Sequence, residues 1–493
     1  MDKKLYITTA IPYVNGAPHI GHAMDYLLAD IWVRYQRQNG YEVRIQSGTD
    51  EHGNKIAAKA AEAGMDPKAY VDKIYGNFEL LIKKLGASYT DFVRTTDEHH
   101  ISSAQYIWQQ LQPYIYKGKY EGWYCVGCEC FVTDKEATDN NGICPDHNQP
   151  YQRLSEENYY LKASAFTDRI KEALNTNEIE IVPEFRKKEF LEMIKDGLQD
   201  VSISRPKKNL SWGIPVPGDS EQVMYVWVDA LTNYITVLGY PDKTGWQDSW
   251  PADLQVLGKD ILRFHLGIWP VILLGIGLQL PKKMLVHGFV NVDGAKQAKS
   301  LGNGVDPIAL VDQYGVDAVR YFFARHIPTL GDGDFTWEKF ENAYNTELVN
   351  DLGNVVQRVA GMVTRYQSGV IGNIPRVDHD VDSYRLAMEK LEFDKAMDEV
   401  WAMVRSLNQY IENVKPWEIA KNIGKDTESA AHLSEVLAYA VGALMQISSL
   451  LVPFLPDTAD KIQKIFGTGA VVLTEGVFFP RIYIHTPDPH AKA

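Results

Sequence analysis

The chain has 493 residues, 45% hydrophobic and 23% charged, with a net charge of −14 and a pI of about 5.4. This length is enough for two or three domains, and the acidic balance argues against indiscriminate nucleic-acid binding while leaving room for RNA on a local basic face. Because no apolar run of membrane-spanning length and no signal-peptide pattern stand out, we expect no membrane association and a cytoplasmic location.

Strand and helix patterns alternate at the start of the chain. Residues 4–11 are typical of a buried strand, apolar side chains then recur at helical spacing from Ile20 to Tyr35, and residues 41–50 are typical of a second strand. Gly40 lies where this helix should end. The alternation predicts a parallel α/β sheet, and we expect residues 1–112 to form the first half of a Rossmann-like catalytic domain.

The α/β pattern is interrupted over residues 113–225, which we predict to be a connective insertion carrying a zinc site. It resumes over residues 226–335, the expected second half of the catalytic domain. Four elements are expected there: a strand at 253–260, one helix at 260–277, a strand at 283–294 and one helix at 305–326, capped by Asp306. After residue 335 only helical periodicities continue until near the end of the chain, so an α-helical bundle is expected over 336–493.

The four cysteines all lie between residues 125 and 144, too few and too local for a disulfide framework. Cys125 and Cys128 form one close pair in "WYCVGCEC", and Cys144 and His147 form a second in "CPDH". Two such pairs predict one closed, tetrahedral Cys3His zinc site with a structural role. Cys130 falls outside this spacing and is not predicted to be a ligand, although it could substitute for one. The alternative is a loop of ordinary thiols.

His19 and His22 follow the first strand and lie at the entrance of the predicted helix. Backbone N–H groups and the helix dipole attract anions at such a position, and both histidines can present N–H donors to a phosphate. Gly21 would let a ligand approach the backbone. From this segment alone, phosphate binding and simple helix capping are equally supported.

Two further cations occur in "GAKQAKSLGN", where Lys296 and Lys299 follow a strand in a glycine-flanked loop. Flexible cations at this position suit an anion whose charge develops during a reaction. A solvated surface loop is the alternative. Because the loop lies late in the same α/β region as the histidine turn, the two segments together favour a phosphate site.

The segments "HIGH" at 19–22 and "KQAKS" at 296–300 resemble the two signature motifs of class I aminoacyl-tRNA synthetases. The paired zinc ligands and four other segments resemble the bacterial type of methionyl-tRNA synthetase with a single Cys3His zinc site: "GTDEHG" at 48–53, "WGIPVP" at 212–217, "VWVDALTNY" at 226–234 and "GKDILRFH" at 258–265. The resemblance covers essentially the whole chain. The family's usual K-M-S-K-S is altered here by Gln297 and Ala298, which affects the packing and closing of the loop more than its charge.

This resemblance implies an enzyme that activates L-methionine with ATP and transfers it to tRNA(Met). By similarity, catalysis would involve His19, His22, Lys296 and Lys299, and ATP would be bound by His19, Gly21, His22, Gly258, Asp260 and Lys299. The methionine site would comprise Ala10, Ile11, Tyr13, Asp50, Trp227, Ala230, Tyr234 and His265. The anticodon would contact Asn354, Arg358 and Trp417. The implied cofactors are one structural Zn2+ and Mg2+ with ATP, and a monomer is expected.

Several of these residues have simpler interpretations. Asp50 would hold the methionine ammonium, but at a strand end it could instead cap the next helix. Trp227 and Tyr234 suit a thioether, yet from the residues alone they would be plain core aromatics. The same alternative applies to Trp417, for which the resemblance favours stacking on an unpaired base.

Other enzymes and binding proteins are less consistent with the sequence. Synthetases for isoleucine, valine and leucine carry a large editing domain, for which the insertion is too short. Cysteinyl-tRNA synthetase uses its zinc to bind substrate, whereas a closed Cys3His set leaves no position for one. A small-molecule nucleotidyltransferase would not need the helical bundle, and only the Gln297–Ala298 change hints at a tRNA-binding protein derived from a decayed synthetase.

Overall fold

The computed structural model describes residues 4–145, 148–296, 304–371, 374, 380–423, 427–472 and 478–483. The chain divides into two compact units, which are described separately. The first comprises residues 1–18, 40–83 and 88–287, and the second comprises residues 19–39, 84–87 and 288–493. The four-part domain division expected from the sequence stays a prediction.

The first unit is built on a six-stranded parallel sheet in the order β3-β2-β1-β12-β13-β7. Its strands are β1 (Lys4–Thr9), β2 (Glu42–Thr49), β3 (Asp91–Arg94), β7 (Glu180–Val182), β12 (Leu254–Gly258) and β13 (Lys283–His287). In the central register Ile7 lies opposite both Ile45 and Leu254, and all three are fully buried. Such burial is expected of parallel strands that are covered on both faces. The predicted parallel α/β sheet is therefore confirmed.

The strand order makes neighbours of β1 and β12, which are far apart in sequence. The pairing continues past the strand end, because the Ala10 N–H donates to the Val256 carbonyl at 3.0 Å. The carboxyl ends of β1, β2 and β12 therefore present Ala10, Asp50 and Gly258 at one edge of the sheet. In open α/β sheets this edge is where ligands bind.

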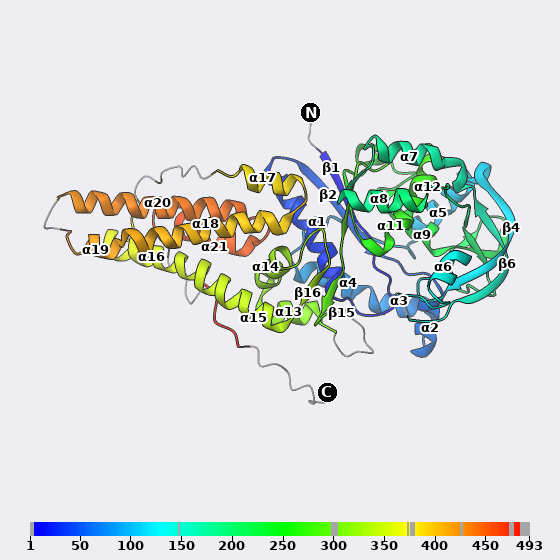
Figure 1. The fold of residues 1–493 in the computed structure, drawn as a ribbon, viewed down its shortest axis with the longest axis horizontal. Coiled ribbons are helices and arrows are strands. Elements are labelled where there is room, and N and C mark those ends of the chain that lie inside the picture. The colour runs from blue at the N-terminus through cyan, green and yellow to red at the C-terminus, as the bar shows by residue number, and fades with distance from the viewer. Residues whose placement is uncertain are drawn as a thin grey trace. The chain divides into compact units, whose positions relative to one another are not determined.

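Helices lie beside the strands of the first unit (Figure 1). They are α2 (Asn54–Glu62), α3 (Pro67–Ile74), α4 (Gly76–Lys84), α5 (Glu98–Gln110), α6 (Asp134–Asp139), α7 (Thr167–Asn175), α8 (Glu184–Met193), α9 (Val226–Leu231), α10 (Asn233–Thr236), α11 (Leu262–Gly267) and α12 (Trp269–Gly275). The single helix expected over 260–277 was wrong. It divides at Ile268, directly before a helix that begins with Pro270 at its second position, where proline contributes no backbone N–H.

The predicted insertion contains an antiparallel sheet in the order β5-β4-β6-β8, built on β4 (Ile115–Cys125), β5 (Cys130–Val132), β6 (Gln152–Leu161) and β8 (Val201–Ser202). The long pair of β4 and β6 is seen as cyan arrows in Figure 1. A smaller sheet follows, from β9 (Ser204–Pro206), β10 (Pro215–Val216) and β11 (Asp219–Met224). The same stretch also supplies β7 to the parallel sheet, so residues 113–225 do not form an isolated insertion.

The second unit contains a small sheet and a set of helices. The sheet has β14 (Val290–Val292), β15 (Ala295–Lys296) and β16 (Gly333–Phe335). The helices are α1 (Ile20–Gln38), α13 (Pro307–Tyr314), α14 (Val316–His326), α15 (Trp337–Asn342), a π-helix (Ala343–Gly353), α16 (Asn354–Gln367), α17 (Asp382–Glu389), α18 (Phe393–Val414), α19 (Pro416–Ala420), α20 (Thr427–Leu451) and α21 (Pro456–Phe466). A fully buried ion pair joins α1 to α14, with Asp30 and Arg320 2.8 Å apart. Arg320 also donates to the carbonyls of Leu85 and Pro453, which satisfies a charge that burial would otherwise make costly.

Two predicted elements near residue 300 are divided in the structure. The strand expected over 283–294 was wrong, because β13 ends at His287 and β14 lies in a different sheet. Gly288 separates them, and a Cβ there would lie 2.2 Å from the Gly331 carbonyl oxygen. The single helix over 305–326 is divided at Gly315, whose φ is +86°. The cap at Asp306 is confirmed, since its carboxylate accepts from the Ile308 N–H at 2.8 Å.

The predicted C-terminal helical bundle is confirmed, and α16, α18, α20 and α21 lie alongside one another in Figure 1. We expected no apolar run of membrane-spanning length, but residues 428–451 of α20 are long and apolar enough by composition. In that apolar window 56% of the residues are buried, and α20 packs against α16, α18, α19 and α21. These properties are those of the core helix of a bundle.

Candidate active site and metal centre

Asp50 lies at the carboxyl end of β2, where it forms a parallel bridge with Tyr13. The Asp50 N–H donates to the Pro12 carbonyl at 2.8 Å, and the Asp50 carbonyl accepts from Val14 at 3.0 Å. Its side chain does not cap the next helix, because the N-cap of α2 is Gly53. The alternative of a capping role is therefore wrong.

The carboxylate of Asp50 is only 8% exposed, and its Oδ1 atom has no hydrogen-bond partner among the described residues. Burial raises the pKa of this carboxyl well above its usual range, and the charges of Asp229 and Glu129 add to the effect. A buried carboxylate oxygen without a partner is costly in the free protein. A cationic ligand group would satisfy it.

Tyr234 and His265, both predicted to contact methionine, are joined by a hydrogen bond of 2.7 Å between the tyrosine Oη and the histidine Nε2. The other ring nitrogen, Nδ1, is 3.0 Å from the Ile261 carbonyl, which can only accept. The proton of His265 therefore lies on Nδ1, and Nε2 accepts from Tyr234. Burial lowers the pKa of His265 to about 4, so the ring is neutral at pH 7.

The other predicted methionine residues lie in the same part of the first unit. Ala10, Tyr13 and Trp227 are partly buried and pack against the core cluster that contains Tyr234. The Trp227 ring stacks on Phe264, with centroids 3.8 Å apart and planes 12° apart. Ala230 is buried one helical turn after Trp227, and Ile11 is half-buried just beyond β1. That these residues surround methionine stays a prediction.

A second buried carboxylate, which sequence reasoning missed, lies near Asp50. Asp229 accepts from His52 at 2.7 Å and from His100 at 2.8 Å, and all three side chains are almost fully buried. Although burial alone would raise it, the two histidines lower the pKa of Asp229. One signal was available, because "VWVDAL" places a single acid in an otherwise apolar run.

Gly258 and Asp260, predicted to contact the nucleoside, follow the end of β12. Asp260 is exposed in a short 3-10 turn, Lys259–Ile261. A Cβ on Gly258 would lie 2.8 Å from Asp260 Oδ1, so the glycine is needed for this arrangement of the carboxylate. The two residues therefore lie together just after β12, and their contact with the nucleoside stays a prediction.

The two histidines of the opening motif form the start of α1 in the second unit. His19 is the N-cap, and its Nδ1 accepts from the Gly21 N–H at 3.1 Å, while His22 Nδ1 accepts from the His19 N–H at 3.2 Å. The rings stack with centroids 3.7 Å apart. A Cβ on Gly21 would lie 2.9 Å from the His19 ring, which explains the glycine. Capping is thus confirmed, and since each Nδ1 accepts, the ring proton lies on Nε2.

Burial, with His19 nearby, lowers the pKa of His22 well below its usual range. The ring is therefore a neutral N–H donor at physiological pH.

The predicted lysine loop is described only at its start. Lys296 is the last residue of β15, and its backbone pairs with Asn291 of β14. Lys299 lies outside the described residues.

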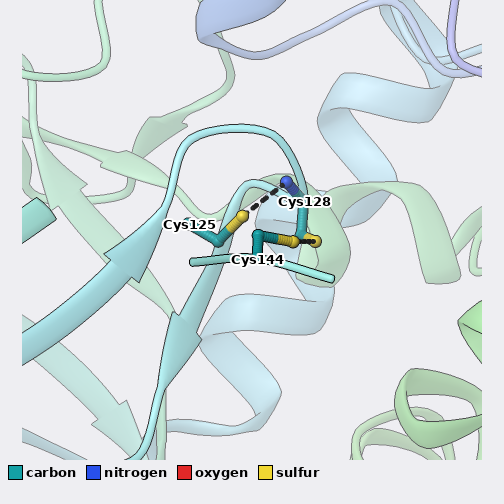
Figure 2. Close-up of side chains that lie close together, drawn as sticks. All are labelled: Cys125, Cys128 and Cys144. Atoms are coloured by element: carbon teal, nitrogen blue, oxygen red, sulfur yellow. Dashed lines mark hydrogen bonds between the residues drawn. The ribbon is translucent and has the colours of Figure 1, made fainter. Parts of the chain in front are cut away.

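Three of the four predicted metal ligands converge. Cys125, Cys128 and Cys144 place their sulfur atoms within 4.8 Å of one another (Figure 2). The Sγ atoms of Cys128 and Cys144 are 3.5 Å apart, close to the separation of about 3.8 Å that tetrahedral geometry with Zn–S bonds of about 2.3 Å requires. The Cys128 N–H also donates to Cys125 Sγ at 3.3 Å. The three thiols fit a metal ion; His147 lies outside the described residues.

Cys130 is not one of the three described thiols that all lie within 4.8 Å of one another, although its side chain also interacts with Cys128. Its Sγ accepts from Arg263 Nη2 at 2.9 Å. That Cys130 is not a metal ligand stays a prediction.

The three predicted anticodon residues lie in the bundle. Asn354 is exposed at the start of α16, and Arg358 follows one turn later. The Arg358 guanidinium lies 5.7 Å from the centroid of the Trp417 ring and forms an ion pair of 2.7 Å with Glu412. Trp417 is only partly buried on α19, so it is not a plain core residue.

Comparisons with known proteins agree along the length of the chain. The family described as "tRNA synthetases class I (M)" matches residues 5–155 and 147–360, and the "anticodon binding domain of methionyl tRNA ligase" matches residues 370–475. The methionine–tRNA ligase of Caldanaerobacter subterraneus subsp. tengcongensis is 42% identical over 95% of this chain and 74% of its own length. That of Clostridium tetani is 42% identical over 94% and 74%. Mycobacterium tuberculosis methionyl-tRNA synthetase in complex with methionyl-adenylate has a TM-score of 0.90 at 34% identity, covering 97% of this chain and 100% of that one.

Proposed function

The chain belongs to the methionyl-tRNA synthetase family and is a methionine–tRNA ligase, and from this premise we propose how its residues share the reaction. In the first step the methionine carboxylate attacks the α-phosphorus of ATP, which forms methionyl-adenylate and releases pyrophosphate. In the second step a 3′-terminal ribose hydroxyl of tRNA(Met) attacks the acyl carbon and releases AMP. The substrates supply both nucleophiles, so the protein must orient groups and stabilise charge.

Asp50 binds the ammonium of methionine. The single observation that carries this assignment is the buried Oδ1 atom without a partner among the described residues. An ammonium donates three hydrogen bonds and carries the complementary charge, so its binding removes the cost of leaving Oδ1 unpaired.

The methionine side chain is enclosed by Ala10, Ile11, Tyr13, Trp227, Ala230, Tyr234 and His265. Aromatic rings suit a polarisable thioether, and the stacking of Trp227 on Phe264 supports a fixed wall. His265 contributes as a neutral ring whose orientation is set by Ile261 and Tyr234. A neutral wall favours an uncharged side chain over a charged amino acid of similar length.

His19 and His22 donate Nε2–H groups to the phosphates of ATP, next to the positive end of α1. Because Gly21 has no side chain, the His19 ring can lie against the start of α1 in the orientation that this contact needs. Lys296 and Lys299 add positive charge as the pyrophosphate leaves. Gly258 and Asp260 hold the nucleoside, with the exposed carboxylate of Asp260 accepting from the ribose hydroxyls.

Asn354, Arg358 and Trp417 read the anticodon of tRNA(Met). Trp417 is partly buried, and the Arg358 guanidinium lies over its ring, an arrangement that leaves a flat surface for an unpaired base. The anticodon-binding family matches residues 370–475, which include Trp417 and support its part of the assignment.

Zinc, held by Cys125, Cys128, Cys144 and His147, has a structural role, since a site with four protein ligands leaves no position for a substrate. When bound, it would fix the loop between β4 and β5. Mg2+ accompanies ATP, and the enzyme acts as a monomer in the cytoplasm.

The decisive experiment is pyrophosphate exchange into ATP in the presence of each amino acid in turn. We expect exchange with methionine alone, followed by aminoacylation of tRNA(Met). Exchange with another amino acid would contradict the methionine pocket, and no exchange at all would favour a tRNA-binding protein without catalytic activity.

A further inference from the structure

Glu129 lies between Cys128 and Cys130 in the metal-binding loop, and its carboxylate is hydrogen-bonded to Tyr13 and Lys55. The residue is only 5% exposed, and its backbone has φ of +49°, an uncommon conformation for a residue with a side chain. A glutamate this deeply buried is costly unless its oxygens are hydrogen-bonded. The hydrogen-bond partners of Glu129 therefore identify the segments to which the metal-binding loop is attached.

Both carboxylate oxygens of Glu129 have partners in segments far away in sequence. Oε2 accepts from the hydroxyl of Tyr13 at 2.8 Å, and Oε1 accepts from the backbone N–H of Lys55 at 2.9 Å. The carbonyl of Glu129 accepts in addition from the Tyr225 hydroxyl at 2.8 Å. Three separate segments of the first unit thus meet at this one residue.

The start of α2 is built to receive this carboxylate. Its N-cap is Gly53, which has no side chain to satisfy the first N–H groups of the helix, so Glu129 supplies the missing acceptor. A Cβ at Gly53 would lie 2.2 Å from Tyr13 Oη and 2.8 Å from Glu129 Oε2. The φ of Gly53 is +115°. Position 53 therefore requires glycine for two reasons: the close approach of Tyr13 and Glu129, and the positive φ.

Tyr13 lies at the methionine pocket, opposite Asp50 in the bridge that joins the segments after β1 and β2. A phenol ring can swing about its side-chain torsions unless its hydroxyl is held, and the bond to Glu129 holds it. The same carboxylate accepts from Lys55 at the start of α2, just after the "GTDEHG" segment that contains Asp50.

We propose that Glu129 is a positioning residue for methionine binding, which holds Tyr13 in place and connects the metal-binding loop to the amino-acid pocket. This inference rests on the proposed role of Tyr13 at the methionine site. Glu129 acts through Tyr13 and does not itself touch the substrate. It therefore sets the affinity for methionine rather than the rate of the chemical step.

The test compares Glu129→Ala, Glu129→Gln and Tyr13→Phe, with Glu121→Ala in β4 as a control for an exposed glutamate. Methionine affinity is measured by calorimetry in the absence of ATP, and kcat and KM by pyrophosphate exchange. Metal content is measured for each variant, so that a loss of the ion is distinguished from a loss of the contact.

We expect Glu129→Ala to raise the Kd and KM for methionine about tenfold or more, as for the loss of a hydrogen bond to a charged group, with kcat and the KM for ATP within about twofold of wild type. Glu129→Gln should restore most of the affinity, because its oxygen can accept from Lys55 while its amide donates to the hydroxyl of Tyr13. On the Tyr13→Phe background, Glu129→Ala should have little further effect on affinity.

An unchanged methionine Kd in a metal-loaded Glu129→Ala variant would overturn the proposal. So would additive effects of Glu129→Ala and Tyr13→Phe, or an equal loss in Glu121→Ala, because each would indicate general loosening of the fold. If the wild-type protein itself did not bind methionine, that result would contradict the proposed function and, as a consequence, this inference.

Discussion

The substitution Asp50→Asn keeps the shape of the side chain and removes its charge. At a separation of about 4 Å and an effective dielectric constant of about 20, an ammonium–carboxylate pair is worth about 4 kcal/mol. Methionine affinity should therefore fall by about a thousandfold. The Kd is measured by calorimetry, with 4-(methylthio)butanoate as a matched ligand that lacks the ammonium. We expect this ligand to bind weakly to both the wild-type protein and Asp50→Asn, with no lower affinity for the variant.

The same substitution should make the protein more stable. The pKa of Asp50 is raised in the folded state, so the unfolded chain loses its proton first, and the free energy of unfolding falls as the pH rises above the ordinary carboxyl value. Asparagine removes this penalty, and the free energy of unfolding at pH 7 should rise. Asp229→Asn is the contrasting control, since that carboxylate has two histidine partners and its loss should lower stability.

Two results would refute this reasoning. Methionine affinity within a few-fold of wild type in Asp50→Asn would mean that the carboxylate does not face the ammonium. A lower stability of Asp50→Asn at pH 7, as for Asp229→Asn, would mean that Asp50 has a packing or hydrogen-bonding role in the fold. Loss of affinity together with a gain in stability is the combination that only a functional carboxylate produces.

Three other predictions concern the lysine loop, the anticodon surface and the histidine in the pocket. Lys299→Ala should raise the barrier to adenylate formation by about 2–4 kcal/mol, measured as kcat for pyrophosphate exchange, and an unchanged rate would exclude a role in charge stabilisation. Trp417→Ala should lower kcat/KM for tRNA by the loss of about 1–3 kcal/mol of stacking while leaving methionine activation nearly intact; equal losses in both assays would indicate a folding defect. The pKa of His265 is lowered from 6.5 to about 4, so the unfolded chain binds its proton first and stability should fall by up to about 3 kcal/mol as the pH drops from 6.5 towards 4. In urea unfolding at several pH values, His265→Gln should remove this part of the slope, and identical slopes would contradict the assignment.

Local patterns were sufficient to predict several elements and the three thiols that converge. The strand before Ala10, the helix that begins after His19 and the cap at Asp306 depend on residues close in sequence, and all three are present. The convergence of Cys125 with Cys128 follows in the same way from a short turn. These features needed no knowledge of the rest of the chain.

Breaks within apolar runs were not predicted, because periodicity continues through them. Pro270 lies near the division of one expected helix, and Gly315 divides another through a positive φ. Gly288 ends an apparently continuous strand where the Gly331 backbone approaches closely. In the last case the reason is a contact with a distant segment, which the local pattern does not contain.

The sequence by itself determined the family, the opening α/β pattern and the types of residue available for phosphate, methionine and metal. Only the tertiary structure decided that β7 leaves the insertion for the parallel sheet, that Asp229 meets His52 across 177 residues, and that Glu129 meets Tyr13 across 116. These pairings depend on which strands become neighbours, and strand order is set by the burial of the whole sheet rather than by any local periodicity.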